Sequence, residues 1–444
     1  MKFHFYNFPF APRRFPFFYG WVVALTGTLG IIASVPGQTH GVSAFTDHLV
    51  QALGINRSRL SIAYMAGTIA SAVLLTNGGK LYDRFGARVV APAACVAMGA
   101  SLLLLSQCDR IAGYITRTLG LTGSWVVPFI VVTILFFGLR FSGQGMMTMV
   151  SRNMIMKWFD VYRGMVVGIT GLLVMPAFNA APKLLNMLVA QMGWRGAWIC
   201  LAAVIGLGFS LLAAILFRDN PEVCGLVPDG QAHNHRDKAN DGGKNNLRQY
   251  TLAEARKTYS FWVFALGLGL FGFLGTGLSF HVSSIFVTSG LTRETGFSIF
   301  IPSVLISMCL RPLAGWLSDR IELKWLLCSM LAGIGISGLG LSMLSPGLSK
   351  WVIVAGNGLS GAIFGLLVGI TWPVFFGREH IGAISGFNMA IMVFTSAIGP
   401  WVFSKSNSML GSYDAAAALC LLSAVVLLIA AMWADNPQES AGRA

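Results

Sequence analysis

Charged residues are scarce in this chain of 444 amino acids, and acidic residues are the scarcer kind. Only 11% of the residues are charged, with 17 Asp and Glu in total. An average soluble domain has about 25% charged residues. Because 55% of the residues are hydrophobic, too little polar surface is available to cover the several soluble domains that this length would otherwise suggest. The composition therefore excludes an ordinary soluble protein.

Cysteine pairs and catalytic motifs are also missing. The seven Cys are scattered, lie mostly in apolar stretches and form no CxxC pair, which is typical of small buried hydrophobic residues. The chain has no P-loop, no HExxH and no GxSxG motif. His233-Asn-His235 has no Cys or carboxylate at metal-binding spacing and is interpreted as a solvated loop. We therefore expect no enzyme activity, no metal site and no cofactor.

Long apolar runs are what the sequence does contain. A bilayer core of about 30 Å needs about 20 apolar residues per helix. Twelve runs of this kind are present, which predicts twelve transmembrane helices. Their approximate limits are 19–45, 60–79, 88–107, 126–150, 164–188, 197–217, 261–287, 297–317, 325–344, 352–376, 382–404 and 415–433.

The longest polar stretch divides the chain into two halves of six helices. We predict a first six-helix bundle over residues 1–217, a cytoplasmic linker over 218–259 and a second bundle over 260–444. Leu252–Thr258 is predicted to form a short interfacial helix before the seventh run.

Basic residues indicate the orientation in the membrane. The net charge of +14 does not suggest a nucleic-acid partner here, because Lys and Arg lie in short stretches between apolar runs. With the N-terminus inside, 20 of the 31 Lys and Arg are cytoplasmic, eight are outside and three lie within runs. This bias predicts an inner or plasma membrane protein with both termini cytoplasmic. The stretch from Met1 to Pro16 lacks the order of features of a signal peptide.

The two halves share an internal repeat. Trp21 precedes His40 by 19 residues, and Trp262 precedes His281 by the same interval. A similar polar loop follows the second helix of each half, and a later pattern of two Gly and one Pro recurs at equal spacing. These later matches are Gly164, Gly168 and Pro182 with Gly382, Gly386 and Pro400. Parallel repeats imply a pseudo-two-fold axis along the membrane normal.

The loop between the second and third runs resembles the signature loop of the major facilitator superfamily, G-x-L-x-D-R-x-G-x-[RK]. The matching positions are Gly79, Leu81, Asp83, Arg84, Gly86 and Arg88. The second copy keeps Gly315, Leu317, Asp319 and Arg320 but has Ile321-Glu322 where the Gly would follow. The resemblance implies an all-α membrane protein of two six-helix bundles that works by alternating access. It also implies that these loop residues act in gating.

Two further stretches resemble the monocarboxylate transporter and oxalate–formate antiporter group. They are Phe18-Tyr19-Gly20-Trp21 with Gly41-Val-Ser-Ala-Phe45, and Arg311-Pro312-Leu-Ala-Gly315. In that group an Arg before Pro lies at the substrate carboxylate, which implies a substrate-binding role for Arg311. Ser307 stands where monocarboxylate relatives can carry an Asp, so their Asp-based proton coupling is not implied here.

Charged residues within the apolar runs are all basic. No Asp or Glu lies well inside a run, whereas Arg140, Lys183 and Arg311 do, and His40 and His281 add two titratable groups. A charge in the membrane is costly and is by default a candidate for function. A cavity without a fixed anion favours an anionic substrate, and the planar guanidinium of Arg suits a carboxylate.

Each of these residues also has a structural interpretation. Arg311 can reach the cytoplasmic interface, Lys183 can extend to the outer interface, and the two His can be packing residues. Arg140 begins the stretch Arg-Phe-Ser-Gly-Gln144-Gly, which is one residue longer than the superfamily motif R-x-x-Q-G, and helix packing is as consistent with it as binding. Pro36-Gly37-Gln38-Thr39 should break the first helix and place His40 near a cavity.

Polar residues on one helix face complete the candidates. Gln144 follows Arg140 by four residues, and Asn388 precedes Thr395 by seven, so each pair shares a face. Such residues line a cavity or bond to neighbouring helices. We take Arg311, His40, His281, Arg140, Gln144 and Asn388 as the candidate substrate-binding residues.

The sequence thus predicts a secondary transporter of a small organic anion, in particular a monocarboxylate. Coupling to protons or to an exchanged anion is expected, with His as the group that titrates near pH 6–7. We expect a monomer in the lipid bilayer. The alternatives are a broad drug or metabolite exporter that depends on Arg140, and a non-transporting membrane sensor.

Overall fold

The computed structural model describes residues 8–121, 123–230 and 248–441, and these residues form helices and connecting turns without any strand. Eleven helical stretches in this part of the chain are long and apolar enough to cross a membrane. Their bounds are Gly20–Gly37, Arg57–Phe85, Ala87–Ser106, Val126–Trp158, Arg163–Leu216, Tyr259–Thr288, Arg293–Ser318, Leu323–Ser342, Ser349–Phe376, Ile381–Leu410 and Asp414–Ala431.

The longest of these stretches accounts for two predicted helices. It begins with α9 (Arg163–Ala203), which contains Gly193 with φ of 72° and ψ of 162°. Only Gly adopts such a backbone conformation readily, so the chain bends there and separates the fifth and sixth predicted runs. The described residues therefore agree with all twelve runs.

The first predicted run is interrupted where its Pro lies. α1 (Gly20–Ala33) is followed by the 3-10 turn η2 (Val35–Gly37), the short α2 (Thr39–Ser43) and α3 (Thr46–Leu53). Proline fixes φ and has no N–H, so it stops the α-helical hydrogen-bond pattern. The break predicted at Pro36 is confirmed, and His40 lies in α2, directly after it.

The chain divides by compactness into two units. The first contains Met1–Asp160, Leu173–Asn234 and Ser385–Ala390, and the second contains Val161–Leu172, His235–Ile384 and Ile391–Ala444. The bundle limits expected at 217 and 260 stay a prediction, because these units exchange two short segments relative to that division.

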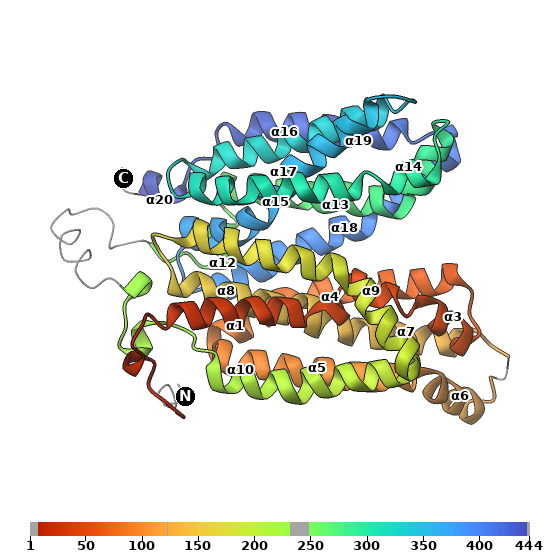
Figure 1. The fold of residues 1–444 in the computed structure, drawn as a ribbon, viewed down its shortest axis with the longest axis horizontal. Helices are drawn as coiled ribbons and strands as arrows, with labels where there is room; N and C mark the ends of the chain where they lie inside the picture. The colour runs from red at the N-terminus through yellow and green to blue at the C-terminus, as the bar shows by residue number, and fades with distance from the viewer. Residues whose placement is uncertain (1–7, 122, 231–247, 442–444) are drawn as a thin grey trace. The chain divides into compact units, whose positions relative to one another are not determined.

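Each unit is a set of helices packed side by side (Figure 1). In the first, α4 (Arg57–Phe85) packs on α7 (Val126–Leu139), and α1 packs on α8 (Thr148–Trp158). In the second, α16 packs against both α17 and α19, and α17 also contacts α15. The bounds are Phe300–Ser318 for α15, Leu323–Ser342 for α16, Ser349–Phe376 for α17 and Asp414–Ala431 for α19.

Several further helices are used in the description of the site below. In the first unit they are α5 (Ala87–Ser106), α6 (Cys108–Thr118), the π-helical segments η3 (Arg140–Met147) and η4 (Val204–Phe209), and α10 (Ser210–Leu216). The other elements that carry the argument below are α12 (Leu252–Ala255), α13 (Tyr259–Thr288), α18 (Ile381–Leu410) and α20 (Pro437–Ala441).

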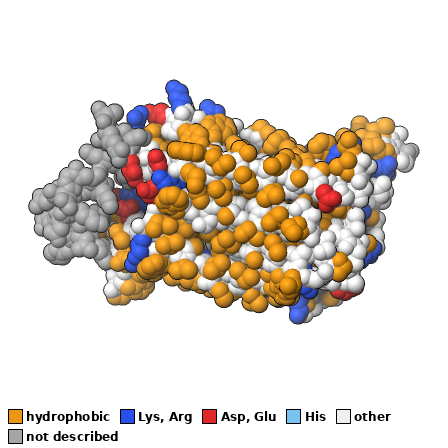
Figure 2. Space-filling view, turned by 90° about the horizontal axis from the view of Figure 1, so that it is seen from above, with side chains coloured by type: hydrophobic (Ala, Val, Ile, Leu, Met, Phe, Trp, Pro, Cys, Tyr) orange, Lys and Arg blue, Asp and Glu red, His pale blue; other side chains and the backbone are white. Residues whose placement is uncertain are grey.

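The surface is hydrophobic where a bilayer would contact it. Figure 2 shows hydrophobic side chains over most of the face in view, with Lys, Arg, Asp and Glu mainly towards its two ends. Individual side chains are far more exposed than a soluble protein would tolerate in such number; Leu207 is 74% exposed and Ile301 is 72% exposed. Such surface is expected for helices that face lipid.

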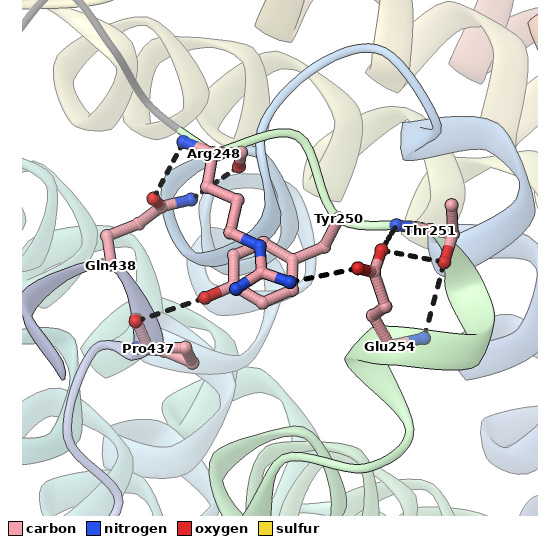
Figure 3. A network of polar contacts seen from close by, with 6 residues as sticks. All are labelled: Arg248, Tyr250, Thr251, Glu254, Pro437 and Gln438. Atoms are coloured by element: carbon pink, nitrogen blue, oxygen red, sulfur yellow. Dashed lines mark hydrogen bonds and ion pairs between the residues drawn. The ribbon is translucent and has the colours of Figure 1, made fainter. Parts of the chain in front are cut away.

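The end of the linker is bound to the C-terminal tail by a polar network that we call the clasp, formed by Arg248, Tyr250, Pro437 and Gln438 (Figure 3). Gln438 accepts a hydrogen bond from the Arg248 amide at 3.0 Å and donates one to the Arg248 carbonyl at 2.9 Å. Tyr250 donates its hydroxyl to the Pro437 carbonyl at 3.2 Å. Within the predicted Leu252–Thr258 helix, α12 forms one turn over Leu252–Ala255.

Candidate functional site

Arg311 is a buried cation within a predicted membrane helix of the second unit. It lies in α15 and is 7% exposed. Its Nη2 donates to the Gly361 carbonyl of α17 at 2.9 Å, and its buried Nε has no hydrogen-bond partner. Two serines on the same helix, Ser303 and Ser307, donate to carbonyls of α17 at 3.3 and 2.7 Å. These bonds fix α15 against α17 and so fix the backbone that carries Arg311.

Glycines leave the room that the Arg311 side chain occupies. A Cβ on Gly171 of α9 would lie 2.0 Å from Arg311 Nη1, and a Cβ on Gly365 of α17 would lie 3.2 Å from the same atom. Gly168, one turn before Gly171, faces the Arg311 backbone. We call Gly171, Gly361 and Gly365 the glycine cradle. A larger residue at Gly171 would overlap the guanidinium itself.

The charge of Arg311 is not balanced within the described part of the chain, where no Asp or Glu pairs with it. Removing an ion from water costs several kcal/mol even after relaxation. A guanidinium has five N–H donors, and only one bond from Arg311 to a protein acceptor is present. The arrangement is therefore able to bind an anion through the remaining donors.

Arg140 is a buried cation of the first unit. It opens η3 and is 4% exposed. Its Nη1 donates to the Gly37 carbonyl at 3.0 Å, and its guanidinium carbon lies 5.1 Å from the Tyr64 ring centroid. Gln144 lies in the same π-helical segment and is half-buried. Arg140 thus contacts the break in the first helix rather than a carboxylate.

The other predicted binding residues have different surroundings. His40 is exposed in α2, with its ring centroid 6.5 Å from that of Phe178. His281 Nε2 lies 2.9 Å from the Pro400 carbonyl, which can only accept, so this nitrogen carries the proton. Asn388 is 1% exposed in the part of α18 that belongs to the first unit.

His40 belongs to the first unit and His281 to the second. From their equivalent positions in the internal repeat we predict that they face each other across a cavity. Lys183 is exposed in α9, as expected of a side chain that extends to the interface.

The signature loop joins α4 to α5 in the first unit. Gly79 is buried in α4, Asp83 lies in its last turn and Arg84 is exposed beside the Phe85 ring. Gly86 has a φ of 76°, which favours Gly between two helices that follow each other directly. Arg88 donates to the carbonyls of Ala214 and Phe8.

Asp219 holds this loop in place. Its carboxylate accepts from the Ala87 amide at 3.1 Å, at the N-terminus of α5, and pairs with the buried Lys157 at 3.3 Å. A Cβ on Gly86 would lie 3.1 Å from Asp219 Cγ. Asp219 was not among the predicted residues. Its position directly after the sixth apolar run was the available signal, because a carboxylate there can meet the basic signature loop.

The second copy of the loop has a related arrangement in the second unit. Asp319 ends α15 and accepts from the Gly164 amide at 3.0 Å, in the first turn of α9. A carboxylate is favourable there because unpaired N–H groups and the helix dipole face it. Arg320 is exposed and lies over the Trp316 ring at 4.1 Å.

The glycine face of α9 was also missed as a site feature. Gly164, Gly168 and Gly171 recur at intervals of four and three, so they share one helix face. In the sequence, Gly164 and Gly168 served only as markers of the internal repeat. The structure places this face against Arg311, Gly315 and Asp319 of α15. A stripe of small residues was the signal that such a close contact would form.

Comparison with known proteins gives the family. A model of the Major Facilitator Superfamily matches residues 25–400. The chain therefore belongs to this superfamily of transporters, and it is a multi-pass membrane protein that carries small molecules by secondary transport. The superfamily and fold expected from the signature loop are confirmed.

One relative is the probable sulfoacetate transporter SauU of Cupriavidus necator, which is 29% identical over 171 residues, or 38% of this chain and 35% of that protein. The match thus spans about a third of the relative's length.

Solved structures agree on the fold. The proton:xylose symporter XylE is similar with a TM-score of 0.66 and 17% identity, over 96% of this chain and 99% of that one. The human organic anion transporter MFSD10 is similar with a TM-score of 0.60 and 15% identity, over 93% and 99%. At these identities the similarity concerns the fold alone.

Proposed function

We propose that this transporter carries a small organic anion with a carboxylate or a sulfonate group, and that Arg311 binds that group. The observation that carries the proposal is a buried guanidinium that has one protein acceptor and no paired carboxylate among the described residues. An anion would offset its desolvation, and charge-assisted bonds to a planar fork are the strong ones.

Two further points support this proposal. The relative from Cupriavidus necator is named as a probable transporter of sulfoacetate, which is an organic anion. The stretch Arg311-Pro312-Leu-Ala-Gly315 resembles helix eight of the monocarboxylate and oxalate–formate group. We propose coupling to protons or anion exchange, with His40 as the exposed titratable group that follows the helix break.

The proposed location is the inner or plasma membrane, with both termini in the cytoplasm and a monomer as the working unit. The positive-inside bias of the predicted loops supports this orientation.

Thermal unfolding of the purified protein in the presence of carboxylates and sulfonates tests the proposal. A ligand that binds the folded state raises the apparent melting temperature by mass action. Arg311→Lys keeps the charge but loses the planar fork. We expect it to weaken binding of the stabilising anion by about tenfold to a hundredfold, since a charge-assisted hydrogen bond contributes about 1.5–3 kcal/mol.

Arg110→Lys is the matched control, because Arg110 is exposed on α6 of the other unit. It should leave anion binding unchanged. Equal affinity of wild type and Arg311→Lys for the stabilising anion would remove Arg311 from the site.

A further inference from the structure

Two helices of the first unit lose regular α-helical geometry where they cross. The first membrane helix, which comprises α1, α2 and α3, is broken by η2 (Val35–Gly37). The fourth membrane helix comprises α7, η3 (Arg140–Met147) and α8, and in η3 the hydrogen bonds run from residue i to i+5. The second membrane helix is α4. At the crossing Gly37 meets Gly143. A Cβ on Gly37 would lie 2.8 Å from Gly143 Cα and 2.9 Å from the Leu139 carbonyl oxygen. The two backbones are therefore in direct contact, and only Gly fits at either position.

The π-helical segment accommodates the extra residue noted in the sequence. The stretch from Arg140 to Gly145 is one residue longer than R-x-x-Q-G. A turn closed by an i to i+5 bond holds one residue more than an α-turn. The insertion is thus absorbed within η3, and α7 before it and α8 after it remain regular. Single π-turns inside α-helices occur frequently at functional sites.

Arg140 binds the backbone group that the break leaves without a helical partner. In a continuous helix the Gly37 carbonyl would accept from the amide of Gly41. Gly41 donates instead to the Gln38 carbonyl at 3.0 Å. Arg140 Nη1 donates to the Gly37 carbonyl at 3.0 Å in its place. The guanidinium therefore fixes the fourth helix to the break itself.

Side chains on both sides of the break add to this contact. Thr39, the first residue of α2, bonds through its hydroxyl to that of Tyr64 at 3.0 Å, and the Tyr64 ring lies beside the Arg140 guanidinium. Gln38 donates to Ser34 at 3.1 Å and to Thr148, just after η3, at 3.2 Å. The residues within and directly after the break are thus held by the second and fourth helices.

The same unit contains a second π-helical segment that lacks such a cation. In η4 (Val204–Phe209), Gly206 meets Gly99 of α5, where an added Cβ on Gly99 would lie 2.8 Å from Gly206 Cα. The partner helix α5 is regular there. A π-helical segment with a glycine contact therefore recurs, but among the described residues only the crossing of the first and fourth helices combines it with a broken partner helix and a buried Arg.

We propose that this crossing is a hinge, on which the segment from Thr39 to Leu53 moves relative to the fourth helix, and that Arg140 is a positioning residue that holds the hinge closed. Breaking the hydrogen bond from Arg140 to Gly37 removes the hold of the fourth helix on the backbone of the break. The Gln38 and Thr39 side chains must then release Thr148 and Tyr64, while the glycine contact remains as the pivot. In this role Arg140 acts on the backbone of the first helix and needs no bound anion, so the inference does not rest on the proposed substrate.

Hydrogen exchange of the purified protein, followed by mass spectrometry without added anion, tests the hinge. Arg140→Gln should raise the exchange rate of the Gly41 and Val42 amides by about tenfold or more, and Arg140→Lys should raise it less. Arg311→Gln, which removes a buried guanidinium of the second unit, should leave these amides unchanged. In proteoliposomes Arg140→Gln should slow transport while the anion affinity stays within about twofold.

A deletion tests the role of the extra residue independently. Deleting Ser142 restores R-x-x-Q-G, so the protein should still insert and unfold cooperatively, with faster exchange after the break because Gly143 no longer meets Gly37. Deleting Ile134 from the regular α7 is the control and should prevent folding, since it rotates everything that follows.

Three results would overturn the hinge. The first is unchanged exchange in Arg140→Gln. The second is a large loss of anion affinity in that variant, which would make Arg140 a ligand instead. The third is that deletion of Ser142 damages folding as much as deletion of Ile134, which would show that η3 does not absorb a residue.

Discussion

Gly171→Ala is a perturbation that acts on Arg311 without changing any charge. The added Cβ would lie 2.0 Å from Arg311 Nη1, 2.7 Å from Cδ and 2.9 Å from Cζ. Three atoms of one side chain overlap the new methyl group, so a small tilt of the guanidinium does not relieve the contact. The whole end of the side chain must move, and its 2.9 Å bond to the Gly361 carbonyl is lost.

The expected cost follows from that displacement. A displaced guanidinium should lose a charge-assisted hydrogen bond to the anion. Such a bond contributes about 1.5–3 kcal/mol, so anion affinity should fall by about tenfold to a hundredfold. The helix itself should not suffer, because Ala in a helix interior is about 0.5–1 kcal/mol more favourable than Gly. Without ligand, the gain in helix propensity and the loss of the Gly361 hydrogen bond act on stability in opposite directions, so the melting temperature should change little.

Substitution of two other glycines should reduce anion affinity by smaller amounts or not at all. Gly365→Ala would bring a Cβ to 3.2 Å from Arg311 Nη1, which a small shift relieves, so its loss of affinity should be less than tenfold. Gly275→Ala, in α13, meets nothing within 4 Å and should have no effect. Isothermal titration of the stabilising anion into all three variants is the assay. Equal affinities across the series would refute the claim that the cradle positions the binding group.

Four further expectations concern other parts of the chain. Asp83→Asn should strongly lower uptake into proteoliposomes while anion affinity changes by less than about tenfold. The reason is that a contact present in a single conformational state changes the equilibrium between the states and not the binding site itself. His40→Gln should change the pH profile of uptake, because imidazole is the side chain whose protonation changes most readily in the physiological pH range. Gln438→Glu keeps the acceptor for the Arg248 amide but loses the bonds that Gln438 donates to the carbonyls of Arg248 and Phe375, so hydrogen exchange at the linker end should rise. Tyr250→Phe loses only the bond to the Pro437 carbonyl and should have a smaller effect. The backbone and hydroxyl of Thr251, with Arg248, lower the pKa of Glu254 from about 4.5 to about 2, so protection of α12 should persist above pH 4.5 and be lost as the pH falls towards 2.

Each of these expectations has its own contrary result. Wild-type uptake in Asp83→Asn would contradict the gating role, and an unchanged pH profile in His40→Gln would place the titrating group elsewhere. Equal exchange in Gln438→Glu and wild type would mean that the clasp does not hold the linker. For the acid transition, Glu254→Gln is the control, because it has no carboxyl to protonate; the same pH dependence in this variant would exclude Glu254 as its cause.

The membrane helices were predictable because their signal is large. A run of about 20 apolar residues between charged loops fits few structures other than a membrane helix. The break predicted at Pro36 in the first helix was also correct. The signature loop was equally easy to recognise, because Gly86 and the charged residues Asp83, Arg84 and Arg88 stand at the spacing of the superfamily pattern. The structure shows why Gly86 is needed there: it has a positive φ and lies close to Asp219.

The details of the candidate site were less predictable because they depend on contacts between distant segments. The sequence places Arg311 in a helix, but it does not show that Gly171, 140 residues earlier, makes room for its guanidinium. The extra residue after Arg140 weakened the match to a known motif, and only backbone hydrogen bonding shows that a π-helical segment absorbs it. His281 was a candidate ligand by its repeat position, and its bond to the Pro400 carbonyl favours a packing role.

Tracer flux through the purified protein in proteoliposomes tests the central claim most directly. Vesicles loaded with an unlabelled carboxylate or sulfonate that stabilises the protein should take up the same labelled anion in exchange. Uptake at low anion concentration should fall by about tenfold or more in Arg311→Lys and should be retained in Arg110→Lys. Uptake of the anion that is equally fast in wild type and Arg311→Lys, or no uptake of any organic anion by wild type, would contradict the account.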